Sequence, residues 1–337
     1  QAQAAVDLLA HHPSVALWCA HAEPVALAAD LPPARMLRRF ARHQLLPGWA
    51  TTVLDPALAE ALDGADGSRP VLAHSGVLPH PSGGADTPAW FGWHHGAERD
   101  LPRWLRRVPA LARFVGAFGA QAVPETADWM DPERWPDLDW EGLARTAGLQ
   151  KAAFDRRVPP AAYTTFAAWR TATQEHQAGL IRNHVEAVRR LKYRPAGGFC
   201  LWSLADARPA VSWSVLDHER VPKLGFAALA AACAPVIVTA DRPAASYQPG
   251  AAEALDVHIV SDLRHPLEGC TLAARLAWPG GSHEWSFGGD VPADAVARVG
   301  TLSFLVPDAP GPLVLDLHLS GPATASASYA SVILPAS

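Results

Sequence analysis

The sequence contains only four cysteines, and they lie far apart. No two of them form a CxxC pair, and none has the spacing of a zinc-binding motif. We expect buried free thiols, because an isolated cysteine behaves as a small apolar residue. A disulfide framework is therefore not expected. The four are Cys19, Cys200, Cys233 and Cys270.

Long apolar runs and an excess of basic charge are also missing. No stretch approaches about 18 uninterrupted apolar residues, so we expect no membrane span. The formal net charge is -5 and the positive residues are scattered, so no basic stripe points to nucleic acid. With 49% hydrophobic and 18% charged residues over 337 positions, the chain suits a globular protein of two or three domains.

Local motifs for metals and cofactors are absent as well. The 15 histidines include His74 and the pairs His11–His12 and His94–His95, but none lies in an HExxH motif or a comparable spacing. Neither a glycine-rich phosphate loop nor a Gly-x-Ser-x-Gly elbow occurs. We therefore expect no bound metal and no cofactor.

The chain begins with Gln1, and no charged leader or cleavage site precedes the first predicted element. We expect that processing or truncation removed what came before. This end indicates no compartment, and the cytoplasm is favoured only as the default.

Residues 1–238 alternate short apolar runs with amphipathic helical stretches, the pattern of βα units around a parallel sheet. The clearest helix is predicted from Thr164 to about Lys192, and another follows Pro222. Residues 76–102 form a long loop, and loops of that length are usually functional. Continuous apolar runs typical of buried strands cover 15–20, 70–75, 113–118 and 198–204, while 211–217 fits either a strand or a loop.

The pattern changes after Pro243. Short runs of alternating polarity follow, separated by glycine and proline turns. This is typical of a small antiparallel sandwich, which we assign to residues 239–337.

Three segments of the first part carry recognisable motifs. HHPSVALWCAHAEP (His11–Pro24) is an apolar strand that ends near a glutamate, RFVGAFGAQAVP (Arg113–Pro124) is a second strand, and Tyr193–Val236 contains LWSLAD, SWS and PK in order. Together they resemble family 2 glycoside hydrolases of the β-mannosidase type. The corresponding family segments are Asn-His-Pro-Ser before an Asn-Glu strand end, Arg-Phe-Val-Ser-Glu-Phe-Gly, and Trp-x-Leu-Asn-Asp followed by Ser-Trp-Ser and Pro-Lys.

The resemblance implies a fold. Residues 1–238 would be the C-terminal portion, about strands 4–8, of a (β/α)8 TIM barrel whose site lies at the carboxyl ends of the strands. Residues 239–337 would be the following immunoglobulin-like sandwich. Strands 1–3 would precede Gln1, so we expect the chain to need the missing barrel half or a partner chain, because open strand edges and an exposed barrel interior are costly.

The resemblance also implies retaining hydrolysis of a β-linked sugar. That reaction needs two carboxyl groups about 5–5.5 Å apart, one protonated and one ionised. Glu23 matches the acid/base, but the nucleophile position holds Ala117, and a methyl group cannot attack a sugar. Replacement by other carboxylates is not expected, because Glu125 and Asp128 lie beyond the strand end and the pair Glu98 and Asp100 is expected to cap a helix near Pro102.

Other polar contacts to sugar are replaced too. Ala22 and Ala205 stand where the family has asparagine, and Pro88 stands where it has histidine. The aromatic faces that remain are suited to the apolar face of a pyranose, whereas Trp169 and Trp213 are expected to pack inside. The substrate-binding positions implied by the resemblance are Trp202, Asp206, Trp90, Asp86, Trp93, Ala22 and Ala205.

We interpret the chain as a catalytically impaired relative that retains a cleft for a mannoside-like, β-linked carbohydrate. Two alternatives stay open. The full-length form is an active exo-β-glycosidase with an unorthodox nucleophile, or the chain is a structural remnant without a site.

Overall fold

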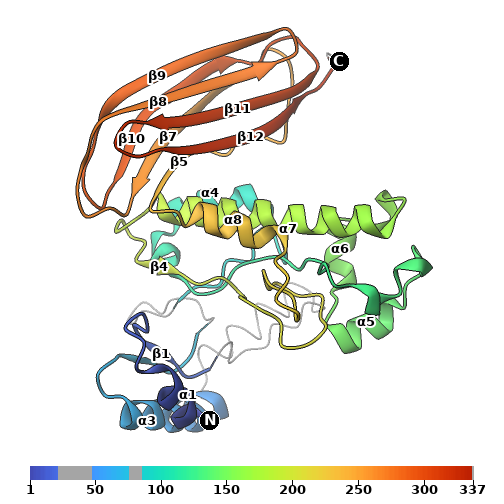
Figure 1. The fold of residues 1–337 in the computed structure, drawn as a ribbon, viewed down its shortest axis with the longest axis vertical. Coiled ribbons are helices and arrows are strands. Elements are labelled where there is room, and N and C mark those ends of the chain that lie inside the picture. The colour runs from blue at the N-terminus through green and yellow to red at the C-terminus, as the bar shows by residue number, and fades with distance from the viewer. Residues whose placement is uncertain (22–47, 76–85, 336–337) are drawn as a thin grey trace. The chain divides into compact units, whose positions relative to one another are not determined.

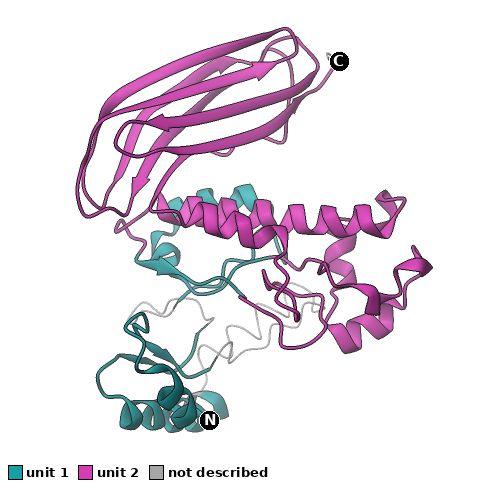
Figure 2. Ribbon diagram, in the orientation of Figure 1, with its two compact units in different colours: residues 1–119, 197–202 teal, residues 120–196, 203–337 magenta. Residues whose placement is uncertain are grey.

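The computed structural model describes residues 1–21, 48–75 and 86–335. The chain divides into two compact units (Figure 2). Unit 1 consists of residues 1–119 and 197–202, and unit 2 of residues 120–196 and 203–337. No helix of the described segments is both long and apolar enough to cross a bilayer.

Unit 1 is built from short helices and very short parallel strands (Figure 1). β1 pairs with β2, and β3 pairs with β4, each in parallel register. Val6, Trp18 and Leu62 form a small core between α1, β1 and α3. Its helices and strands are α1 (Ala2–Leu9), β1 (Trp18–Cys19), the π-helix η1 (Ala50–Leu54), α3 (Asp55–Ala65), β2 (Val71–Leu72), η2 (Glu98–Asp100), α4 (Leu101–Arg107), η3 (Pro109–Ala112), β3 (Phe114–Val115) and β4 (Gly198–Phe199).

The four segments predicted as buried strands each contain a strand, although each strand has only two residues. Residues 211–217, which fitted either a strand or a loop, form a loop with isolated bridges at Ser212 and Leu216. The predicted capping of α4 is wrong for the side chain of Asp100, which occupies the N-cap position without a side-chain cap hydrogen bond. Its Oδ2 instead accepts the backbone N–H of Ala97 at 2.7 Å, at the start of η2. Residues 76–85 of the predicted long loop lie outside the described residues.

The helical part of unit 2 is organised around α7, which is the predicted long helix. Thr165 caps its first turn, since its side chain accepts the N–H of Ala168. Figure 1 shows α8 lying along α7. Trp169 is fully buried among aromatic rings, as predicted. The elements are η4 (Asp128–Met130), η5 (Pro132–Arg134), α5 (Trp140–Ala147), α6 (Lys151–Arg157), η6 (Pro160–Ala162), α7 (Phe166–Arg189) and α8 (Leu224–Ala232).

The remainder of unit 2 consists of two antiparallel sheets with one parallel edge pair, as the alternating polarity predicts. Along β11, Leu313, Leu315, Leu317 and Leu319 are buried and the residues between them are more exposed, because successive side chains of a strand point to opposite faces. The sheets have the orders β10-β7-β5 and β6-β12-β11-β8-β9. The strands are β5 (Val236–Ala240), β6 (Ser246–Tyr247), β7 (Ala252–Ser261), β8 (Leu267–Trp278), β9 (Gly281–Val291), β10 (Val296–Leu305), β11 (Gly311–Ser320) and β12 (Ala325–Ile333).

β5 spans the predicted boundary between residues 238 and 239, which stays a prediction. The expectation of buried cysteines is wrong for three of the four. Cys270 is buried, but Cys19, Cys200 and Cys233 are exposed. They stand at the ends of short strands or of a helix, where the chain leaves the packed interior.

Candidate functional site

Three segments of unit 1 lie side by side through parallel backbone hydrogen bonds. They are residues 86–90, 114–118 and 197–202, and their parallel direction brings their carboxyl ends to one edge. The bonds run from Thr87 N–H to Phe114 O at 2.9 Å, Gly116 N–H to Thr87 O at 3.1 Å, Ala89 N–H to Ala117 O at 2.7 Å, Cys200 N–H to Val115 O at 2.8 Å and Trp202 N–H to Phe118 O at 3.2 Å. We call this edge the strand-end site.

Ala117 lies in the middle segment of the strand-end site. It forms a parallel bridge with Pro88 on one side, and the next residue, Phe118, accepts the amide of Trp202 on the other. Its side chain is only 6% exposed. The nucleophile position is thus held between two strands, and it carries a methyl group with no ionisable atom.

Asp86 is the one acidic residue in the three segments. It is buried, and its Oδ2 accepts the hydroxyl of Ser75 at 2.6 Å. Its carboxylate lies directly against Gly116, filling the space that a side chain there would take. Asp86, which was predicted to contact sugar, therefore packs inside the protein beside Gly116, the residue before Ala117.

The two cysteines of unit 1 lie near this carboxylate. Partial burial, and secondly the negative charge of Asp86, raise the pKa of the thiols of Cys19 and Cys200. A nucleophilic cysteine needs a lowered pKa, because the thiolate is the reactive form. Neither thiol is therefore suited to replace a carboxylate nucleophile.

The three candidate tryptophans of unit 1 differ in exposure. Trp202 is 45% exposed at the end of its segment, and Trp90 is partly buried with its ring edge-on to His94. Trp93 is fully buried, so it has no face for a sugar in this structure. Trp202 and Trp90 flank the middle segment from its two neighbours, which suits them to cover the apolar face of a pyranose.

The three segments of the strand-end site do not include the other predicted site residues. Ala22 and Glu23 lie outside the described residues. Ala205 and Asp206 belong to unit 2. Of the carboxylates considered as replacements, Glu125 is paired with Arg170 at 3.3 Å, on an exposed part of unit 2.

Asp206 is part of a buried polar network in unit 2. Its two carboxylate oxygens accept the hydroxyls of Ser212 at 2.7 Å and Ser214 at 2.6 Å, and Lys223 Nζ lies 3.8 Å away. Burial lowers the pKa of Lys223 to about 8, although Asp206 and Asp217 oppose this shift. Because both oxygens of Asp206 are engaged inside the unit, its geometry suits a structural role better than a sugar contact.

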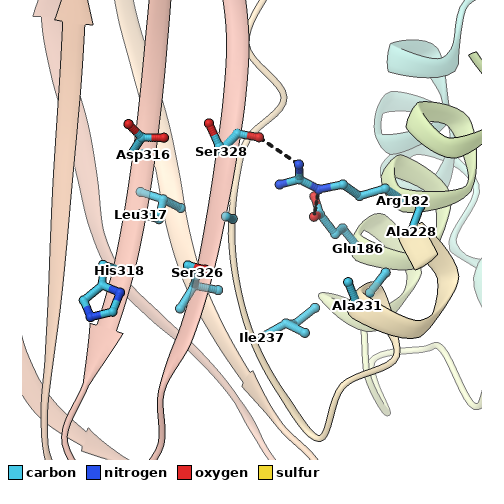
Figure 3. Close-up of a pocket in the computed structure, with 13 residues that line it drawn as sticks. Arg182, Glu186, Ala228, Ala231, Ile237, Asp316, Leu317, His318, Ser326 and Ser328 are labelled. Carbon is cyan, nitrogen blue, oxygen red and sulfur yellow. Dashed lines mark hydrogen bonds and ion pairs between the residues drawn. The ribbon is translucent and has the colours of Figure 1, made fainter. Parts of the chain in front are cut away.

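A cavity of about 640 Å³ lies in unit 2 beside α7, α8, β11 and β12 (Figure 3). Arg182 donates to the carbonyl of Ser328 at 2.7 Å and to Glu186 at 2.6 Å, so its charge is already partnered at this wall. None of the residues expected to contact sugar lines this cavity.

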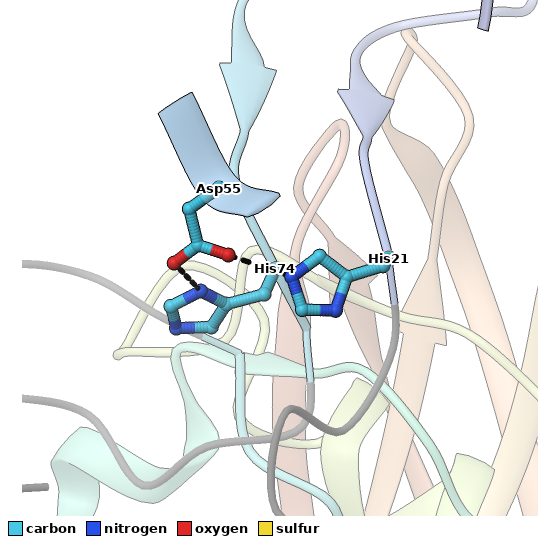
Figure 4. Close-up of side chains that lie close together, drawn as sticks. All are labelled: His21, Asp55 and His74. Atoms are coloured by element: carbon cyan, nitrogen blue, oxygen red, sulfur yellow. Dashed lines mark hydrogen bonds and ion pairs between the residues drawn. The ribbon is translucent and has the colours of Figure 1, made fainter. Parts of the chain in front are cut away.

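One cluster among the described residues could hold a metal ion. It consists of His21, Asp55 and His74, all in unit 1 (Figure 4). Local spacing in the sequence did not indicate it, because 34 residues separate His21 from Asp55 and 19 separate Asp55 from His74. The detectable signal was that His21 directly follows the predicted strand 15–20 and that His74 lies at the end of the predicted strand 70–75.

No protein-family model matches the chain. Its sequence is 25% identical over 263 residues to β-mannosidase B of Thermothelomyces thermophilus, a match that covers 69% of this chain and 29% of that protein.

Two groups of solved structures share the fold. The β-D-mannosidase of Dictyoglomus thermophilum aligns with a TM-score of 0.67 at 16% identity, covering 99% of this chain and 40% of that one. The exo-chitosanase CsxA of Amycolatopsis orientalis aligns with a TM-score of 0.63 at 13% identity, covering 98% and 38%. The resemblance to family 2 glycoside hydrolases is confirmed, and this chain spans between 29% and 40% of the length of these relatives.

Proposed function

We propose that the chain is the C-terminal part of a β-mannosidase-type family 2 protein that holds a β-linked carbohydrate at the strand-end site and is catalytically impaired. In this proposal the parallel segments of unit 1 are strands 4–8 of a (β/α)8 barrel, and the two sheets of unit 2 are an immunoglobulin-like sandwich. The chain order of three parallel pairings supports the barrel, because each of them joins two segments that follow one another in the series. These pairings are β1 with β2, Pro88 with Ala117, and β3 with β4.

The proposal of catalytic impairment rests on Ala117, the residue at the nucleophile position. Double displacement needs a carboxylate that attacks the anomeric carbon, and a second carboxyl group about 5–5.5 Å away. The side chain at the nucleophile position is a methyl group held between two strands. Asp86 is engaged with Ser75, and the nearby thiols have raised pKa values. The described strand ends thus offer no evident nucleophile.

Carbohydrate binding has different requirements from hydrolysis. An aromatic face beside the apolar face of a pyranose, with a few polar groups at its edge, is sufficient for recognition. Trp202 and Trp90 meet the aromatic requirement on either side of Ala117. Glu23 stays the proposed acid/base, two residues after His21 in the sequence.

One observation favours a second candidate, an active exo-β-glycosidase. The carboxylate of Asp86 lies against Gly116, next to the nucleophile position. If a sugar drew this carboxylate outward, Asp86 would supply the missing negative charge. This candidate predicts turnover that is lost in Asp86→Asn.

The proposed barrel needs more strands than the five parallel segments of unit 1. This chain spans 40% of the β-D-mannosidase of known structure. We propose that the other strands come from the rest of a longer polypeptide or from a partner chain. A monomeric chain of these 337 residues that unfolds in one cooperative thermal transition would contradict this dependence.

The test uses the protein expressed from its full reading frame, with PNP β-mannoside, β-glucoside and β-glucosaminide as probes. We expect saturable binding in calorimetry without release of nitrophenol. Added azide or formate should restore transfer, because the anion attacks the anomeric carbon in the space left by the missing carboxylate while the aryl oxide leaves. Turnover without an added anion would contradict the proposal that the protein is catalytically impaired. The absence of both binding and rescue would favour the alternative that the chain is a structural remnant without a site.

A further inference from the structure

Three potential metal ligands meet in unit 1 from three different elements. His21 follows β1 by two residues, His74 follows β2 by two residues, and Asp55 is the first residue of α3. Because β1 and β2 are parallel neighbours, both histidines lie at the same edge of the pair. A backbone hydrogen bond from Ser75 N–H to His21 O at 3.0 Å continues the pairing to this point.

Asp55 lies between the two imidazole rings, as Figure 4 shows. Its Oδ1 is 2.6 Å from His21 Nε2, and its Oδ2 is 2.8 Å from His74 Nδ1. One nitrogen of each ring and a carboxylate oxygen all lie within 4.8 Å of one another. Asp55 is buried, whereas the side chains of His21 and His74 are 17% and 23% exposed, so the cluster has a dry side and a side that reaches solvent.

The donor set identifies the chemical class of ion. Two imidazoles and one carboxylate are the ligands of zinc sites that leave a fourth position for water, and imidazole selects first-row transition metals over magnesium or calcium. Metal–ligand distances of about 2.0–2.2 Å place tetrahedral ligand atoms roughly 3.3 Å apart. The present separations from Asp55 are shorter because hydrogen bonds hold them, so an ion would move the groups apart by about half an ångström.

Protons must also be accounted for. In the present geometry, the carboxylate of Asp55 accepts an N–H from one nitrogen of each ring. An ion needs the lone pair of that same nitrogen, so each ring must carry its proton on its other nitrogen instead. Asp55 changes from accepting two hydrogen bonds to donating an electron pair to the metal.

We propose that His21, Asp55 and His74 form a binding site for a divalent transition-metal ion, with zinc as the fitting ion. The bound ion fastens the ends of β1 and β2 to the start of α3. The expectation that no metal binds rested on local spacing, and ligands that come from three elements do not need local spacing.

The experiment titrates untagged, chelator-stripped protein with ZnCl2 in a calorimeter and with CoCl2 in a visible-light spectrometer. We expect one ion per chain and ligand-field absorption typical of low-coordinate cobalt. His21→Ala and His74→Ala should each weaken binding by about 100-fold or more, since even changes to groups behind the ligands cost 10–100-fold. The matched control is His11→Ala/His12→Ala, which removes an exposed pair of adjacent histidines from the same unit and should leave binding unchanged.

Two results would overturn the site. One is the absence of saturable binding by the wild-type protein, and the other is an equal loss in the control, which would mean adventitious binding to surface histidines. If circular dichroism shows that a ligand variant does not fold, X-ray absorption at the zinc edge of the wild-type complex decides. Two imidazole ligands with oxygen ligands completing the coordination support the site, and a zinc ion without two imidazole ligands contradicts it.

Discussion

The carboxylate of Asp86 fills the space in which a side chain at Gly116 would lie. A Cβ built on Gly116 would overlap Asp86 Oδ2 and Cγ. Asp86 is buried there and holds the hydroxyl of Ser75. The absence of a side chain at position 116 therefore lets a carboxylate reach the strand immediately before the nucleophile position.

Gly116→Ala should destabilise unit 1. The new methyl group collides with a buried, hydrogen-bonded carboxylate, and overpacking costs about 1–3 kcal/mol. Urea unfolding measures the change in free energy. The matched control is Gly64→Ala in α3, where nothing lies within 4 Å and the helix should gain up to about 1 kcal/mol. Adding Asp86→Ala to Gly116→Ala should recover part of the loss, and equal stability of Gly116→Ala and wild type would contradict the contact.

Ala117→Glu should restore turnover of PNP β-mannoside in the full-length protein. The new carboxylate can form the covalent intermediate, provided that Glu23 serves as acid/base. We expect release of nitrophenol at least about 100-fold faster than from Ala117→Gln, which has the same size without the charge. Equal rates for the two folded variants would mean that the strand-end site no longer aligns a sugar for attack.

Trp202→Ala should weaken carbohydrate binding about tenfold. Loss of one aromatic face is worth roughly 1–1.5 kcal/mol, which corresponds to that factor. Calorimetric titration with a β-mannoside measures it. Trp104→Ala removes a tryptophan of α4 that is half exposed in the same unit, and it should leave the affinity unchanged. Equal losses in the two variants would place the sugar away from Ala117.

Lys223 should make unit 2 more stable as the pH rises above about 8. Burial lowers the pKa of its ammonium group to about 8, below its ordinary value of 10.5. Between these values the unfolded chain binds the additional proton, so the free energy of unfolding rises with pH by at most about 1.4 kcal/mol per pH unit.

Comparison with Lys223→Met separates the effect of Lys223 on the free energy of unfolding from the effects of cysteines and tyrosines that titrate in the same pH range. The destabilisation caused by Lys223→Met, measured by urea unfolding, should grow between pH 8 and 10. A destabilisation that shrinks over that range would mean that folding raises the pKa of Lys223 and does not lower it.

His258 in β7 should reduce stability in mild acid. Burial first, and then the positive charge of Arg190, lower its pKa to about 4 from 6.5. The unfolded chain therefore binds more protons between pH 6.5 and 4, and stability that is fully present above pH 6.5 is lost as the pH falls through this window. The ring is partly exposed, so screening keeps the slope below about 1 kcal/mol per pH unit.

His258→Gln removes the titrating ring and keeps a polar side chain. Thermal unfolding at pH 7 and pH 5 should show a smaller difference for this variant than for the wild type. Asp256 does not interfere, because Arg298 and Thr301 lower its pKa to about 2 and its contribution is lost only at more acidic pH. An unchanged pH dependence would exclude His258 as the cause.

Much of the fold is encoded in local patterns that a single sequence displays. Alternating leucines along β11 and the helical spacing of α7 require only neighbouring residues, so both elements could be predicted. The motif around Ala117 likewise identified a parallel strand beside Trp202. The strands of unit 1 are shorter than predicted, because apolar runs do not specify how many residues keep backbone pairing.

What the sequence by itself determined is therefore the type of the elements with a clear local period, and the lack of an ionisable group at position 117, since both follow from residue identity and local period. The tertiary structure alone decided which side chains meet. Parallel pairing brings His21 and His74 to one edge, and the start of α3 adds Asp55, although 34 and 19 residues separate them from it. Asp86 covers Gly116 for the same physical reason: contacts between strands depend on register and direction, which no local period records.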